Sequence, residues 1–263
     1  MLSPSSIAFT IFPLIFHMGA GLALPTKQQP LGSNAINSLQ RTREALQKAE
    51  IIPTVIDDFH PSLTLSVTWS KSHVAKLGNT IAPKHLQDEP TIALHHSGDD
   101  EASDKTYVVT LTDPDAPSRD NPKWSEMCHW IATNVSVAQN SEIYSILPVP
   151  AHVPELGNDG SRPSVDGFGG DAVVSPKKGG GNPPEDIVEY KPPGPPEKTG
   201  KHRYVFLVLT PQNGTKEPLH LSKPDDRQHW GTGEEGGGVR DWAKENGLVP
   251  VAANFIYSQN KKQ

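Results

Sequence analysis

The chain is organised around residues 107–135, which read YVVTLTDPDAPSRDNPKWSEMCHWIATNV. A β-branched run at 107–112 predicts a strand. Pro114 and Pro117 follow this run, and each proline fixes φ near about −65° and lacks a backbone N–H donor. The strand must therefore end here, and the chain that leaves it is stiff.

Two carboxyl groups and an imidazole are expected where this strand meets the next one. Asp113 and Asp115 flank the first proline, and a second apolar run at 128–135 places His129 near its start. Trp124 lies in the polar loop between the two runs. A strand, a rigid acidic corner and a second strand with an imidazole at its start are typical of a fixed polar pocket.

A distant segment is expected to supply another wall of this pocket. Residues 201–209 read KHRYVFLVL, and their unbroken apolar run predicts a central strand buried on both faces. Side chains alternate between the two faces of a strand, so His202 and Tyr204 share one face while Arg203 lies on the other. We therefore expect the two imidazoles and the phenol to converge.

The rest of the chain favours a mainly β domain that is rich in loops. Proline is abundant, at 26 of 263 residues, and stretches that favour helix are few. Hydrophobic patterning predicts helices at 37–50 and 239–246, strands at 63–69 and 90–94, and a last extended segment at 251–257.

Four segments are expected along the chain. An apolar run ending in Gly21-Leu22-Ala23, a small-x-small pattern suited to cleavage, predicts a signal peptide at 1–23. Residues 24–36 read as a flexible lead-in, and 37–263 as one domain. Within that domain, the stretch at 151–193 is rich in glycine and proline and predicts a surface insertion, with a brief ordered segment at 187–190.

Charge and cysteine content narrow the possible classes. The net charge is −6 and there is no basic stripe, which argues against a nucleic-acid surface. Cys128 is the only cysteine, so no intramolecular disulfide can form, and we expect a small buried residue there. Glycosylation sequons begin at Asn134 and Asn213, and Asn213 is the better candidate because it lies in a predicted turn.

Three kinds of site remain open. A metal site of two aspartates and two histidines is one, although no tight ligand spacing such as HExxH is present. Acid–base hydrolysis is another, but Ser118 and Ser125 do not stand in a GxSxG-type turn. The third is a small anion pocket, in which carboxyl groups orient donating imidazoles. The simplest alternative is that the two histidines are core residues, each hydrogen-bonded to a carboxylate. Because both histidines lie beside strand-end prolines, a pocket is favoured.

Three blocks together resemble the phosphatidylethanolamine-binding protein (PEBP) family. They read LTDPDAPSRDNPKW with CHWIATNV, GPPEKTGKHRYVFLVLTP, and RQHWGTG with GVRDWAKENGLVPVAANFIY. The long insertion and the DIVEYKPPGPP lead are similar to the fungal, carboxypeptidase Y inhibitor-like branch. The resemblance covers residues 57–257. It implies a mainly β fold, with a central antiparallel sheet packed on a smaller sheet, peripheral helices and a long irregular insertion.

The resemblance also implies a pocket for small anions and for phosphorylated or lipid headgroups. Carried over to this chain, the pocket residues are Asp113, Asp115, Pro117, Trp124, His129, Gly194, Pro195, Pro196, His202 and Tyr204. Trp124 takes a position usually held by tyrosine, and Met127 stands where many relatives have a bulky aromatic residue. Arg203 is expected to be a structural ion-pair partner. The carboxyl groups would stabilise both imidazoles in their charged form.

We therefore expect a non-enzymatic ligand-binding or regulatory protein, without catalytic residues, cofactor or metal. Its expected ligands are phosphate and phosphorylated or phospholipid headgroups. Inhibition of a serine carboxypeptidase is the alternative function, and a secreted hydrolase is a third. The expected location is outside the cell or in the lumen of the secretory pathway or vacuole, with no transmembrane segment in the mature chain.

Overall fold

The computed structural model describes residues 32–95, 105–135, 185–215 and 219–263. The expected signal peptide at 1–23 and most of the expected insertion at 151–193 lie outside these ranges. Within them, no helix is both long enough and apolar enough to cross a membrane.

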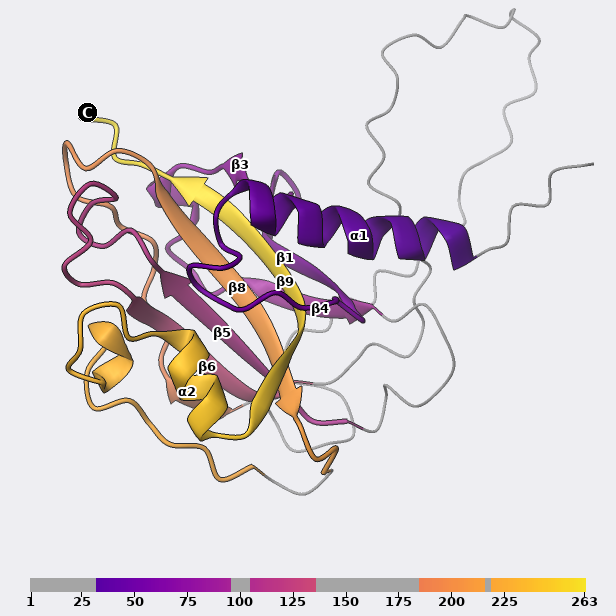
Figure 1. Ribbon diagram of the computed structural model, residues 1–263. Helices are drawn as coiled ribbons and strands as arrows, with labels where there is room; N and C mark the ends of the chain where they lie inside the picture. Colours follow the sequence, from indigo (N-terminus) through magenta and orange to yellow (C-terminus); the bar gives the residue numbers. More distant parts are fainter. Residues whose placement is uncertain (1–31, 96–104, 136–184, 216–218) are drawn as a thin grey trace, which may run out of the picture. The chain divides into compact units, whose positions relative to one another are not determined.

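The larger of two sheets has six strands in the order β3-β9-β8-β5-β6-β7 (Figure 1). The strands are β3 (Asn79–Thr80), β9 (Leu248–Ser258), β8 (His202–Pro211), β5 (Tyr107–Asp113), β6 (Met127–Val135) and β7 (Glu185–Val188). Every pairing in this sheet is antiparallel except that of β3 with β9. The expected central antiparallel sheet is therefore confirmed.

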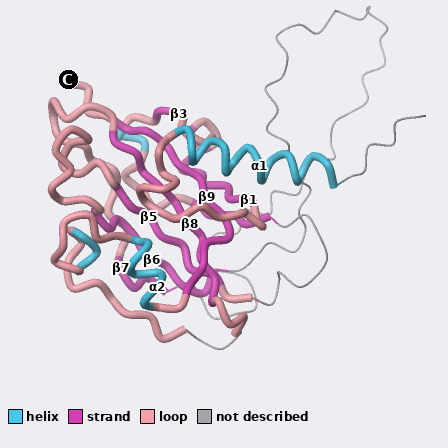
Figure 2. The backbone as a smooth tube through the Cα atoms, in the orientation of Figure 1, coloured by secondary structure: helices cyan, strands magenta, loops and turns pink. Residues whose placement is uncertain are grey.

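The smaller sheet has three strands in the order β2-β1-β4. They are β2 (His73–Val74), β1 (Thr64–Ser70) and β4 (Thr91–His95). Two α-helices, α1 (Gly32–Lys48) and α2 (Val239–Glu245), and two short 3₁₀ turns, η1 (Pro83–His85) and η3 (His229–Gly231), complete the described elements. Figure 2 shows the helices as separate cyan segments around the magenta strands.

The six-stranded sheet is covered on both faces. Alternate side chains of β5 point to opposite faces, so Val108 joins a core with residues of α1 and α2, while Val109 joins a core with β1 and β4. The same alternation along β8 sends Val205 to the first core and Phe206 to the second. This double coverage explains why the β8 sequence is continuously apolar, as predicted.

Two predicted boundaries are wrong. The first helix begins at Gly32 instead of residue 37, so the end of the expected lead-in is helical; no proline stands at 33–36 to stop it. The expected insertion reaches too far, because its part at 185–188 is β7, an edge strand of the main sheet. Val188 is only 5% exposed there and packs on the core, whereas Glu185 and Asp186 are exposed.

Candidate functional site

The topology brings the predicted pocket residues to one end of the main sheet. β5 pairs antiparallel with both β6 and β8, so its end adjoins the starts of those two strands. Asp113 is the last residue of β5, His202 is the first of β8, and His129 is the third of β6. Figure 1 shows the arrowhead of β5 at the end of the sheet where β8 begins.

Asp113 and His202 form a buried pair. Asp113 Oδ2 lies 2.9 Å from His202 Nδ1, and the two residues are 3% and 1% exposed. Asp113 Oδ1 accepts a hydrogen bond of 2.8 Å from the backbone N–H of Asp115. The other ring nitrogen of His202, Nε2, lies 3.0 Å from Thr199 Oγ1. Both ring nitrogens of His202 therefore have hydrogen-bond partners in the described structure.

Tyr204 lies between the two imidazoles. Its ring is stacked on that of His202 with centroids 6.3 Å apart, and it meets the ring of His129 edge-on at 5.3 Å. Burial, and next the neighbouring Asp113 carboxyl group, raise the pKa of the Tyr204 phenol far above its usual value. The hydroxyl therefore stays protonated and can donate. The two distant segments converge as the sequence predicts.

His129 is held in one orientation by the chain at Lys191. Its Nδ1 lies 2.7 Å from the Lys191 carbonyl oxygen, which can only accept, so Nδ1 carries the proton. Burial lowers the pKa of His129, while the charge of Asp113 acts in the opposite direction. Burial therefore acts against the charged form of His129 that the nearby carboxylate favours.

Asp115 is bound by Arg203 and does not turn its carboxyl group to the imidazoles. The guanidinium donates to it from Nε at 2.9 Å and from NH2 at 2.6 Å, and the backbone N–H of Arg203 adds a bond of 2.8 Å. Arg203 NH1 also donates to the carbonyls of Ala49 and Glu50, both at 3.0 Å. Arg203 thus ties the acidic corner to the chain after α1, as expected of a structural ion-pair partner.

Two loops border the site. The backbone N–H of Trp124 donates to Ala116 O at 3.0 Å, which folds this loop back on the corner that contains Pro117. In the second loop, Thr199 Oγ1 donates to the carbonyl of Pro196 at 2.9 Å. Asn260 Nδ2 donates to the carbonyl of Pro195 at 3.3 Å, and Gly194 is exposed.

Sequence reasoning missed two residues that fix this geometry. Thr199 was not singled out, although it stands three residues before His202 and could have been found as a hydroxyl within reach of the ring. The contact of the Lys191 carbonyl with His129 could not be predicted, because every residue has a backbone carbonyl and the residue type does not single one out. In the described part of the chain, no three histidine, cysteine, aspartate or glutamate side chains come close enough to hold a metal ion.

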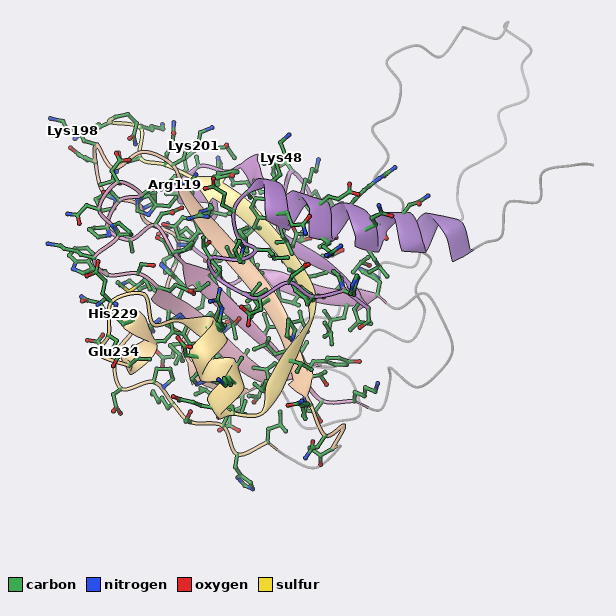
Figure 3. All side chains as sticks on the ribbon, in the orientation of Figure 1. Lys48, Arg119, Lys198, Lys201, His229 and Glu234 are labelled. Carbon is green, nitrogen blue, oxygen red and sulfur yellow. The ribbon has the colours of Figure 1, made fainter. Side chains whose placement is uncertain are left out.

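Cationic side chains lie around this end of the sheet. Figure 3 shows Arg119, Lys198 and Lys201 near the start of β8, and all three are exposed. Arg119 is paired with Glu50, with 2.5 Å between NH2 and Oε2. The two lysines stand in the loop before β8 and give this rim a local positive charge in a chain that is negative overall.

Comparison with known proteins identifies relatives over most of the chain. Residues 71–256 match the model of the family described as phosphatidylethanolamine-binding protein. A protein named carboxypeptidase Y inhibitor, from Saccharomyces cerevisiae, is 29% identical over 87% of this chain and 100% of its own length. An uncharacterized protein of the same yeast is 32% identical over 82% of this chain and 92% of its own length.

Solved structures agree with these matches. The crystal structure of carboxypeptidase Y inhibitor complexed with the cognate proteinase is similar with a TM-score of 0.64 and 28% identity, over 86% of this chain and 98% of that one. A phosphatidylethanolamine-binding protein from Plasmodium vivax gives a TM-score of 0.55 at 16% identity, over 83% and 97%. The second likeness supports the fold alone.

Proposed function

Because this chain belongs to the phosphatidylethanolamine-binding protein family, we propose that it is a non-enzymatic regulator that inhibits a serine carboxypeptidase. The observation that carries the proposal is the match to a yeast carboxypeptidase Y inhibitor over all of that protein's length. The likeness to the crystal structure of such an inhibitor with its proteinase supports it further. Inhibition, the alternative function expected from the sequence, is therefore the first proposal.

A direct assay tests inhibition. The chain from residue 1 and the chain from residue 24 are each titrated into a purified serine carboxypeptidase, and release of the C-terminal residue from a blocked dipeptide is followed. We expect the rate to fall to a low residual value near an equimolar ratio. A serine endopeptidase assayed in parallel controls for general interference. Full carboxypeptidase activity with an excess of both chains would rule the proposal out.

A second function is supported by the geometry at the sheet end. We propose that the site binds a small anion such as a phosphate ester or a phospholipid headgroup. Tyr204 presents a protonated hydroxyl beside the ring of His129, and this hydroxyl forms hydrogen bonds with the Asp113 side chain and the Gly194 backbone. The exposed lysines at 198 and 201 attract anions to this rim. Titration calorimetry with a phosphate ester tests it, and absence of heat that saturates would contradict it.

We also propose that the chain enters the secretory pathway. The apolar segment at 1–23 supports this location. Asn213 is exposed in the turn after β8, with its side-chain Oδ1 accepting from the backbone N–H of Thr215 at 3.1 Å, so a glycosylating enzyme can reach it. The Asn134 side chain lies outside the described structure.

A further inference from the structure

We infer that a cavity beyond the end of β8 holds the first sugar of a glycan carried by Asn213. The cavity lies at the arrowhead end of β8, away from the candidate site at the start of this strand (Figure 1). Its volume of about 480 Å³ is within the range of small-ligand sites. Asn213 is itself a lining residue, together with Pro211, Gln212, Leu219 and Leu221. The inference rests on the proposed entry into the secretory pathway and adds where the sugar packs.

Hydrogen bonds to the residues that follow α2 fix two walls of this cavity. In the turn after β8, the backbone N–H of Gln212 donates to the Gly247 carbonyl at 2.9 Å. In the segment before η3, the backbone N–H of Ser222 donates to Asn246 Oδ1 at 2.8 Å, and Asn246 Nδ2 donates to Ser222 Oγ at 2.9 Å. Both walls are therefore tied to the end of one helix, and the cavity is part of the fold.

The side-chain nitrogen of Asn213 is available at the edge of the cavity. Its Oδ1 accepts from the backbone N–H of Thr215 at 3.1 Å, whereas its Nδ2 forms no hydrogen bond with any described residue. In N-glycosylation, the asparagine Nδ2 bonds to C1 of an N-acetylglucosamine. The C1–O bond to the lipid pyrophosphate of the oligosaccharide donor breaks, and one amide proton leaves. The first sugar is thus attached directly beside the cavity.

The lining of the cavity suits this sugar. Leu219 and Leu221 are partly buried and pack against the core, so their remaining surface offers an apolar wall. The C–H face of a pyranose ring and the methyl of its N-acetyl group can cover such a wall and remove it from water. The Gln212 side chain is exposed and forms no hydrogen bond with a described residue, so its amide can bond to the sugar's hydroxyl or acetamide groups.

Enzymatic release of the glycan tests the inference. The full chain is made through the secretory pathway of a yeast, and mass spectrometry identifies the glycosylated asparagine. An amidase that cuts between asparagine and the first sugar is then compared with an endoglycosidase that cuts between the first and second sugars. We expect the endoglycosidase to act on the folded protein. The amidase should be at least about tenfold slower on the folded than on the unfolded protein, because the bond opens to it only when the sugar leaves the cavity.

A relocated glycan is the matched control. Glu197→Asn creates a sequon with Lys198 and Thr199 in the exposed loop before β8, and Asn213→Gln removes the original one. In this double variant the amidase should release the glycan from the folded and the unfolded protein at similar rates. Trimming the parent to one sugar at Asn213 should leave its unfolding temperature about 2–4 °C above that of Asn213→Gln.

The outcomes separate the inference from the proposal beneath it. Amidase release as fast from the folded parent as from the folded double variant would overturn the inference, while leaving a secreted and glycosylated chain. A chain that is secreted without a sugar on Asn213 would overturn it as well. A chain that stays in the cytosol without any glycan would contradict entry into the secretory pathway, and the inference with it.

Discussion

Glu126 is a buried carboxyl group whose protonation should control stability. It is 4% exposed, and its Oε2 accepts from Thr112 Oγ1 at 2.9 Å and from the Val239 backbone N–H at 3.3 Å. Its backbone N–H donates to the Gly237 carbonyl at 3.0 Å. Burial raises the pKa of Glu126 from 4.5 to about 8, and the two hydrogen bonds and the charge of Arg240 only partly oppose it.

The raised pKa sets the sign and size of a pH effect. Below pH 4.5 the carboxyl group is protonated in both states and contributes its full share of stability. Between pH 4.5 and about 8 only the unfolded chain ionises, so each pH unit costs about 1.4 kcal/mol of unfolding free energy. The loss reaches about 5 kcal/mol near the upper end of this range.

The substitution Glu126→Gln should abolish this loss, because an amide resembles the protonated carboxyl group and does not titrate. Urea unfolding of both proteins at about pH 4.5, 6 and 8 gives the difference in unfolding free energy at each pH. We expect this difference to move in favour of the variant by several kcal/mol as the pH rises. The exposed Glu185→Gln is the matched control and should show no such trend. A difference that stays constant with pH would refute the reasoning.

Three further changes have expected outcomes. Arg203→Ala leaves a buried carboxyl group without its partner and should lower the unfolding free energy by about 3–5 kcal/mol in urea; a loss below about 1 kcal/mol would contradict this role. Gly238→Ala places a Cβ 2.3 Å from the Glu126 carboxyl group and should lower the unfolding free energy by about 1–3 kcal/mol. Gly194→Ala is the control: a Cβ there meets nothing nearer than 3.9 Å, so this variant should unfold at the same temperature as the parent. Asn213→Gln should remove the mobility shift that a glycosidase causes in protein made through the secretory pathway, and a shift that persists would place the glycan elsewhere.

Local hydrophobic patterns in the sequence predicted the strands that bury a continuous or an alternating series of apolar side chains. The run at 205–209 predicted a strand covered on both faces, and β8 is one. The alternation at 63–69 predicted a strand with one buried face, and β1 buries Leu65 and Val67. The two-residue strands β2 and β3 were missed, because two residues are too few to show a period.

The sequence also indicated which polar residues gather at the strand ends, but not how they pair. Prolines that follow a strand and histidines at the start of a strand can be recognised from the sequence. The sequence does not indicate which aspartate pairs with the imidazole and which with the guanidinium. Asp113 and Asp115 have the same side chain, but Asp113 contacts His202 and Asp115 is bound by Arg203.

The sequence by itself determined the strands, the acidic corner and the opposite faces of His202 and Arg203, because these follow from dihedral limits and from the two-residue period of a strand. Only the tertiary structure decided that the pKa of His129 is lowered and that of Glu126 raised. Both depend on how much water the surrounding chain removes and on which backbone groups approach, and these contacts arise between segments far apart in the sequence.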